Sequence, residues 1–128
     1  MGCRANVHFI QDNGETIHFY THWNGDRLPE IVAKALDRGR VRWHDDAYLA
    51  RIIFCEMIQD DVLGTTGYGI STHWYDTDPE NTDVIVDARN QTVEMEGKAK
   101  YSFSEFVRLY GDKDEVSART IDGNTEVL

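Results

Sequence analysis

The sequence predicts an α+β domain in which an antiparallel β-sheet, built from hairpins, carries two to three helices packed mainly on one face. Short segments rich in β-forming residues alternate with turn residues, and two longer segments carry apolar residues at helical spacing. The length of 128 residues suits one hydrophobic core. We therefore expect a single domain over residues 1–111 and a polar, flexible C-terminal tail over residues 112–128.

The N-terminal part of the chain predicts a β-hairpin. The segments 5–11 and 15–23 are rich in β-forming residues, and they flank Asn13-Gly14, a pair that tolerates the positive φ angles of a tight turn. With Asn13 and Gly14 as a two-residue loop, the register follows, and a slip by one residue would change every partner. The expected pairs are Ile10 with Ile17, Phe9 with His18, and His8 with Phe19.

Three helices are predicted. The first covers residues 28–38, with Pro29 in its first turn and Gly39 after its end. The second begins after the capping candidates at 45–46 and is apolar nearly all round, so we expect it to be the central core helix. A short third helix follows Ser102-Phe103-Ser104-Glu105, which has the spacing of a capping box, and ends at Gly111.

Three further strands complete the predicted order β-β-α-α-β-β-β-α. A glycine-rich segment over 64–69 leads into a strand over 70–75, and Asp78-Pro79 then turns the chain. The segments 84–86 and 92–95 read as a second hairpin. Strands that follow one another through short turns pair in antiparallel fashion, which is the reason for expecting an antiparallel sheet.

Charge and cysteine content exclude several classes of protein. The formal net charge of −10 opposes the phosphate backbone that nucleic-acid-binding proteins must neutralise, so we expect no nucleic-acid partner. Two cysteines, Cys3 and Cys55, are too few for a disulfide framework. No apolar run is long enough to span a bilayer, and the first residues lack the apolar core of a signal peptide. We expect a cytoplasmic protein without a membrane partner.

Several blocks of the sequence occur together in a known family. They are Met1 to Asn6, Tyr20-Thr21-His22-Trp23-Asn24-Gly25, Leu28-Pro29, Arg42-Trp43, Tyr48 to Met57 and Gly64 to Ser71. In these blocks the chain resembles, over about residues 1–95, a family of short proteins from phages of actinobacteria and from related bacteria. The resemblance implies a viral origin, action in the host cytoplasm and interference with the host. It implies no particular activity, and the sequestration of a nucleotide-derived defence signal enters only by analogy with other small phage proteins.

The five histidines raise the question of a metal site. On one strand His18 and His22 would share a face but lie about 13 Å apart, at 3.3 Å per residue, too far to bind one ion directly. No HExxH, paired CxxC or EF-hand spacing occurs. We therefore assign no metal ligand and no cofactor. The alternative that stays open is that His22 and His73 converge from different strands together with an aspartate.

The segment 38–44 points most clearly to a ligand. It concentrates three arginines and Trp43 in an acidic chain, and arginine binds phosphate bidentately while tryptophan stacks on a base. Equally, these arginines could complement the helix C-terminus and pair with carboxylates. Arg51 projects from an apolar stripe and needs a partner or a ligand. The expected ligand site consists of Tyr20, His22, Arg42, Trp43, Arg51, Tyr68 and Ser71.

The sequence favours a binding protein over an enzyme. We expect a phage-derived protein that sequesters a nucleotide-like or other anionic small molecule without catalysis, as a homo-oligomer if one subunit cannot enclose the ligand. One alternative is a hydrolase or phosphodiesterase acting on such a molecule, with His22 or His73 as base or metal ligand and Asp76 assisting. Another is an acidic protein that inhibits a host factor through its charged surface. We assign no catalytic residue.

Overall fold

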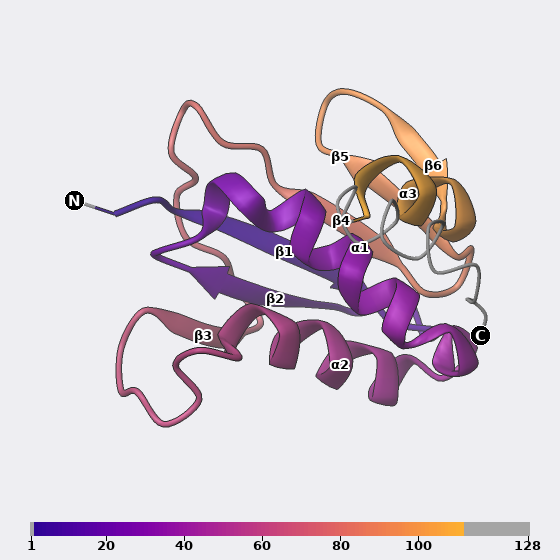
Figure 1. Ribbon diagram of the computed structural model, residues 1–128, viewed down its shortest axis with the longest axis horizontal. Coiled ribbons are helices and arrows are strands. Elements are labelled where there is room, and N and C mark those ends of the chain that lie inside the picture. Colours follow the sequence, from indigo (N-terminus) through magenta and orange to yellow (C-terminus); the bar gives the residue numbers. More distant parts are fainter. Residues whose placement is uncertain (1, 112–128) are drawn as a thin grey trace, which may run out of the picture.

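The computed structural model describes residues 2–111, so the expected tail over 112–128 lies outside the described residues. A six-stranded sheet carries three α-helices on one face (Figure 1). The α+β class is therefore confirmed. The strands are β1 (Ala5–Ile10), β2 (Thr16–Thr21), β3 (Tyr68–Ser71), β4 (Val84–Asp87), β5 (Thr92–Met95) and β6 (Lys100–Ser102). The helices are α1 (Leu28–Arg38), α2 (Asp46–Ile58) and α3 (Phe103–Tyr110), with short 3-10 turns at Gly25–Arg27 and Arg40–Arg42.

The sheet is mixed, whereas hairpins alone predict an antiparallel one. Its strand order is β3-β2-β1-β4-β5-β6. Four of the pairings are antiparallel, but β1 and β4 run parallel, with Val7 beside Val84 and Phe9 beside Val86. Strand β2, helices α1 and α2 and strand β3 intervene in the chain between β1 and β4, which gives the long connection that a parallel pair requires. β1 therefore lies in the middle of the sheet, between β2 and β4.

The N-terminal hairpin forms, but its register differs by one residue from the expected one. His8 lies opposite His18, Phe9 opposite Ile17, and Ile10 opposite Thr16. The loop holds three residues, Asp12-Asn13-Gly14, because Gln11 N–H donates to the Glu15 carbonyl and Gly14 N–H donates to the Gln11 carbonyl. Gly14 has a φ of +88°, the left-handed conformation that closes a three-residue hairpin loop. The slip places the two histidines side by side.

Helix α1, rather than α2, is the central helix. Six of its residues are buried, and it packs against both α2 and α3. In α2 only Leu49, Ile53 and Met57 are buried, and Tyr48 is half exposed. The expectation that α2 forms the core is therefore wrong. An outer helix at the edge of the layer buries one stripe only, whatever the polarity of its other faces.

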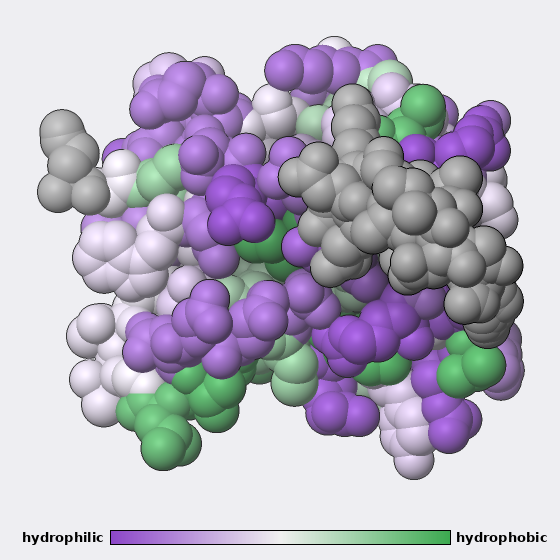
Figure 2. Space-filling view, viewed as in Figure 1, coloured by the Kyte–Doolittle hydropathy of each residue, from purple (hydrophilic) through white to green (hydrophobic). Residues whose placement is uncertain are grey.

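The hydrophobic core lies between the helices and one face of the sheet. Alternate strand residues face it, such as Val7 and Phe9 of β1 and Val84 and Val86 of β4, all fully buried. Figure 2 shows the outer side of the helices, which is mainly hydrophilic, with hydrophobic atoms over the loop between α2 and β3. No helix among residues 2–111 combines the length and hydropathy needed to cross a membrane.

Helix α3 begins at a capping box, as the sequence predicts. The Ser102 hydroxyl accepts from Glu105 N–H at 3.1 Å, and the Glu105 carboxylate accepts from Ser102 N–H at 3.1 Å. Replacing Ser102 with alanine is expected to lower the free energy of unfolding by about 1 kcal/mol, because the cap hydrogen bond is lost. Urea denaturation measures the change. Ser104→Ala, two residues further along the chain, is the control and should cost less; an equal loss would contradict the role of the cap.

Candidate functional site

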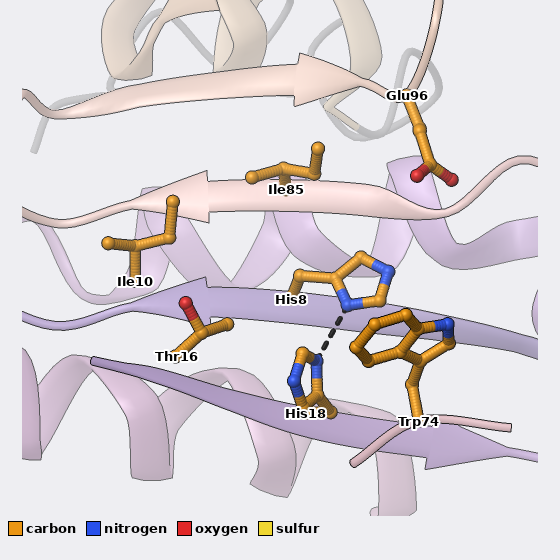
Figure 3. Close-up of a pocket in the computed structure, with 7 residues that line it drawn as sticks. All are labelled: His8, Ile10, Thr16, His18, Trp74, Ile85 and Glu96. Carbon is orange, nitrogen blue, oxygen red and sulfur yellow. Dashed lines mark hydrogen bonds between the residues drawn. The ribbon is translucent and has the colours of Figure 1, made fainter. Parts of the chain in front are cut away.

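The second face of the sheet carries no helix in residues 2–111 and holds polar and aromatic side chains instead (Figures 1 and 3). We call it the open face. Residues that alternate with the core positions project from it, including Asn6, His8 and Ile10 of β1 and His18 of β2. Part of this face lies under the segment 72–83, which is bonded to β1 through Asn6: its amide donates to the Tyr75 carbonyl at 2.8 Å.

A chain of hydrogen bonds joins Asp83, His8 and His18. His8 Nε2 lies 2.7 Å from Asp83 Oδ2, and His8 Nδ1 lies 2.7 Å from His18 Nδ1. Both ring nitrogens of His8 are therefore engaged, and its side chain is only 12% exposed. The chain links three elements: β2, the central strand β1 and the residue that precedes β4. The observed hairpin register produces it, because the histidines are direct cross-strand partners.

Asp83 is the most constrained group of the site. Its side chain accepts from Asn6 N–H at 2.9 Å, from the Thr77 hydroxyl at 2.6 Å and from the His8 ring. Burial by itself would raise the pKa of Asp83, but the hydrogen bonds from His8, Thr77 and Asn6 outweigh it and lower that pKa below its ordinary value. The carboxylate is therefore ionised at neutral pH.

His18 ends the chain as a neutral imidazole. Burial lowers the pKa of His18, and the neighbouring His8 and His73 lower it further, more than Asp83 raises it. At neutral pH its Nδ1 is bonded to His8. A neutral imidazole can accept a proton from a ligand or a water molecule, as a general base does.

A cavity of about 270 Å³ opens beside this chain (Figure 3). Trp74, from the segment that follows β3, lies at its side: its ring centroid is 5.7 Å from that of His8 and 5.0 Å from that of His18. Apolar walls come from Ile10 and Ile85, while Thr16 and Glu96 supply polar atoms. Despite these contacts Trp74 is 60% exposed. The cavity therefore presents an indole face, two imidazoles and one carboxylate.

Three of the residues expected at the ligand site also belong to the open face, but to a second group. Tyr20 contacts His22, with its hydroxyl 2.9 Å from His22 Nδ1, and its ring packs on Tyr75. Ser71 lies opposite His18, and its hydroxyl is 2.7 Å from His73 Nδ1. Burial raises the pKa of Tyr20, so its hydroxyl stays protonated. This second group neighbours the cavity but does not line it.

The other expected residues lie on the helical side. The Arg42 guanidinium lies over the Tyr48 ring at 4.6 Å, and the Trp43 indole donates to the Leu36 carbonyl at 2.8 Å while its ring packs on Phe103. Tyr68 is paired with Thr21 there. The structure therefore does not bring the seven residues into one site. The arginines around Trp43 have separate partners, since Arg38 pairs with Glu56 and Arg40 with Asp37.

Arg51 lines a second, apolar cavity of about 260 Å³ at the β3 end of the helical side. Its other walls are Ile17, Phe19, Ala50, Phe54 and Ile70. The guanidinium lies 4.0 Å from the Cys55 sulfur, which is a weak contact. Among its lining residues in 2–111, Arg51 alone is titratable, so this cavity offers far less chemistry than the open face.

Sequence reasoning did not assign to the site His8, His18, Trp74 and Glu96, which line the cavity, or Asp83, which is bonded to His8. The signal for the histidine pair lies in the turn: Asp12-Asn13-Gly14 also fits a three-residue loop with glycine in the left-handed position, and that loop gives the observed register. Asp83 and Glu96 are separated from His8 by more than 70 residues. Only the parallel pairing of β1 and β4 brings them near.

None of the known family models, curated proteins or solved structures matches this chain. The resemblance to phage proteins therefore stays a prediction.

Proposed function

We propose that the protein binds a small planar heterocycle, uncharged or cationic, in the cavity of the open face. The observation that carries this proposal is Trp74, whose indole is 60% exposed although it packs on His8 and His18 at the side of the cavity. A flat ligand stacked on this indole would remove its apolar face from water. Stacking on an aromatic side chain accepts many ring systems, including nucleobases.

The size and the walls of the cavity define the ligand further. A cavity of about 270 Å³ is at the lower end of ligand pockets, which measure about 300–1,000 Å³. It suits one ring system, or the ring part of a larger molecule. Ile10 and Ile85 would contact the apolar surface of the ring, while Glu96 and His18 would take hydrogen bonds from its edge.

The charge of the cavity favours an uncharged or cationic ligand over the anionic one expected from the arginines. Glu96 lines the cavity, and no lysine or arginine is among its lining residues in the described part of the chain. A phosphate group placed here would meet the Glu96 carboxylate without a compensating cation. Of a nucleotide-like ligand, the cavity would therefore bind only the base or the nucleoside part. Sequestration of a host signal, in a phage setting, is the biological role that would go with such binding.

The proposal is tested by isothermal titration of the full chain with free nucleobases, nucleosides and the matching nucleoside monophosphates, in buffer containing a chelator. We expect saturable binding of at least one base or nucleoside, and weaker binding of its monophosphate. Trp74→Ala should weaken that binding by about 5–150-fold, because stacking contributes about 1–3 kcal/mol. Trp23→Ala is the matched control, since Trp23 is similarly exposed but lies outside the cavity.

Three results would count against this function. They are the absence of saturable binding in the whole panel, tighter binding of the monophosphate than of the nucleoside, and an equal loss of affinity in the Trp23 variant. The first and the third would show that the indole face of Trp74 is not a specific ligand contact, and the second would show that the cavity does not disfavour a phosphate group.

Hydrolysis is the second candidate, and the Asp83–His8–His18 chain favours it. A carboxylate that orients one imidazole, which in turn contacts a second neutral imidazole, is suited to pass a proton away from an attacking water molecule. The base would be His18, in place of the His22 or His73 expected from the sequence. Bound ligand released by denaturing the complex distinguishes the two functions: intact ligand supports binding, and a cleaved product supports the hydrolase.

A further inference from the structure

Three potential metal ligands of the open face lie close together. One nitrogen of His8 and one carboxylate oxygen each from Asp83 and Glu96 are within 4.8 Å of one another. Figure 3 shows the Glu96 carboxylate directed across β4 toward the His8 ring. The three residues lie on or next to neighbouring strands. His8 is in β1, Asp83 directly precedes β4, and Glu96 directly follows β5. Sequence reasoning assigned no metal ligand because these residues form no local motif.

The backbone fixes the spacing of the three groups. Glu96 N–H donates to the Asp83 carbonyl at 3.0 Å, which extends the β4–β5 ladder by one pair. Asn6 N–H donates to Asp83 Oδ1 at 2.9 Å, which ties the same residue to β1. Residues held by two neighbouring strands keep their side chains in place before a ligand arrives. Such preorganisation distinguishes a metal site from scattered surface carboxylates.

Groups behind the three residues also orient them as metal ligands require. A metal-bound histidine usually has its second ring nitrogen bonded to another group, and His8 Nδ1 is bonded to His18 Nδ1 at 2.7 Å. The Asp83 carboxylate is oriented by the Thr77 hydroxyl at 2.6 Å. Both residues are thus positioned by contacts that leave His8 Nε2 and Asp83 Oδ2 directed toward each other, 2.7 Å apart.

The geometry points to a site for a divalent first-row transition-metal ion, bound by His8 Nε2 and by the carboxylates of Asp83 and Glu96. One imidazole and two carboxylates suit Zn²⁺, Co²⁺, Fe²⁺ or Mn²⁺ better than Ca²⁺, which prefers oxygen ligands alone. Three protein ligands leave a fourth position for water or a ligand. In a tetrahedral site two such ligand atoms lie about 3.4 Å apart, so His8 and Asp83 need to separate by less than about 1 Å.

The histidine pair allows this change without a net loss of protons. Without metal, the two contacts fit a pair of tautomers in which His8 Nε2–H donates to Asp83 and His18 Nδ1–H donates to His8 Nδ1. With metal, His8 carries its proton on Nδ1 and donates it to His18 Nδ1, and His18 carries its proton on Nε2. The lone pair of His8 Nε2 then becomes available to the ion. His18 is therefore a positioning residue for the metal.

The metal site shares His8 and Glu96 with the cavity, but the ion needs no organic ligand, so metal binding is tested without a heterocycle. The test is a titration of the full chain with Co²⁺ and Zn²⁺, followed by visible absorption for Co²⁺ and by calorimetry for Zn²⁺. We expect one ion per chain. Glu96→Gln should weaken binding at least tenfold while leaving the fold intact, since Glu96 is exposed. His8→Ala should abolish the Co²⁺ spectrum, and circular dichroism shows whether that variant folds.

Matched variants separate this site from other metal-binding residues. Glu15→Gln changes an exposed glutamate elsewhere, and His73→Ala removes an open-face histidine outside the triad; neither should alter the affinity. His18→Ala should weaken binding by about 10–100-fold, and His18→Asn should restore part of it, because an amide can again accept from His8. The proposal is overturned if neither ion saturates a single site, or if Glu96→Gln binds as tightly as the parent chain. Nucleoside binding measured with a chelator present reports separately on the proposed function.

Discussion

Replacing Asp83 with alanine is expected to lower the free energy of unfolding by about 3–5 kcal/mol. Asp83 is 3% exposed, and its carboxylate accepts from Asn6 N–H, the Thr77 hydroxyl and the His8 ring. Alanine leaves these donors without an acceptor, and each unsatisfied buried donor costs about 1–3 kcal/mol. Urea denaturation at neutral pH measures the change. The loss should be accompanied by loosening of the chain around Thr77, whose hydroxyl donates to Asp83, while the Arg4–Asp78 ion pair still holds the segment 72–83.

Two controls make the Asp83 experiment specific. Asp76→Ala removes an exposed carboxylate from the same segment and should change stability by less than about 0.5 kcal/mol. Asp83→Asn keeps an acceptor oxygen and should cost less than alanine. If Asp76→Ala proves as damaging as Asp83→Ala, the hydrogen-bonded chain does not hold this part of the fold together.

Asp83 should also make stability depend on pH. Its folded pKa is lower than its unfolded value of about 3.9. The ionised carboxylate therefore contributes stability that is fully present above the unfolded pKa and is lost as the pH falls through the folded pKa. Asp83→Asn should remove this contribution, so its stability should fall less steeply below about pH 4 than that of the parent chain.

Replacing Phe9 with alanine is expected to lower the free energy of unfolding by about 3–5 kcal/mol as well. Phe9 is fully buried in the middle of β1, and its ring stacks on Phe19 with centroids 6.0 Å apart. The change leaves a cavity between the sheet and the helices, where neighbouring side chains cannot close in completely. Urea or thermal unfolding measures the loss.

Ile70 supplies the control for Phe9. Ile70 is in the edge strand β3, on the same face of the sheet as Phe9, but it is 58% exposed. Ile70→Ala should therefore cost less than about 1 kcal/mol. A loss for Ile70→Ala equal to that for Phe9→Ala would contradict the position of the core.

Local signals predicted the elements well. The bounds of α1, the cap of α2 at Asp45 and the capping box of Ser102 agree with the structure because each depends on residues a few positions apart. The strand expected over 70–75 is instead Tyr68–Ser71, and β6 was missed. β6 has three residues, too short for an alternating pattern to reveal it.

The candidate site could not be predicted, because it depends on register and on distant pairing. Asn13-Gly14 fits two hairpin loops that differ by one residue, and the choice decides whether His18 meets Phe9 or His8. Asp83 reaches His8 only through the parallel β1–β4 pair. Amphipathic patterns show which residues leave the core but not which of them meet on the open face.

The arginine-rich segment misled for a different physical reason. Its charges suggested an anion site. In the structure, however, Arg38 pairs with Glu56, Arg40 pairs with Asp37, and Arg42 lies over the Tyr48 ring. In a chain with a net charge of −10, carboxylates compete with any anionic ligand for guanidinium groups. Composition identifies a cluster of charge, but it does not show whether the cluster is already paired.

The most direct test of the open face as the binding site is a nuclear magnetic resonance titration of the indole N–H signals. The chain has three tryptophans. Trp74 lies at the cavity, Trp43 is on the helical side with its indole bonded to the Leu36 carbonyl, and Trp23 is exposed outside the cavity. On addition of a nucleoside that binds, the Trp74 signal should shift and saturate while those of Trp43 and Trp23 stay in place. A saturating shift of the Trp43 signal with the Trp74 signal unchanged would contradict binding at the open face and would place the ligand beside the arginines around Trp43.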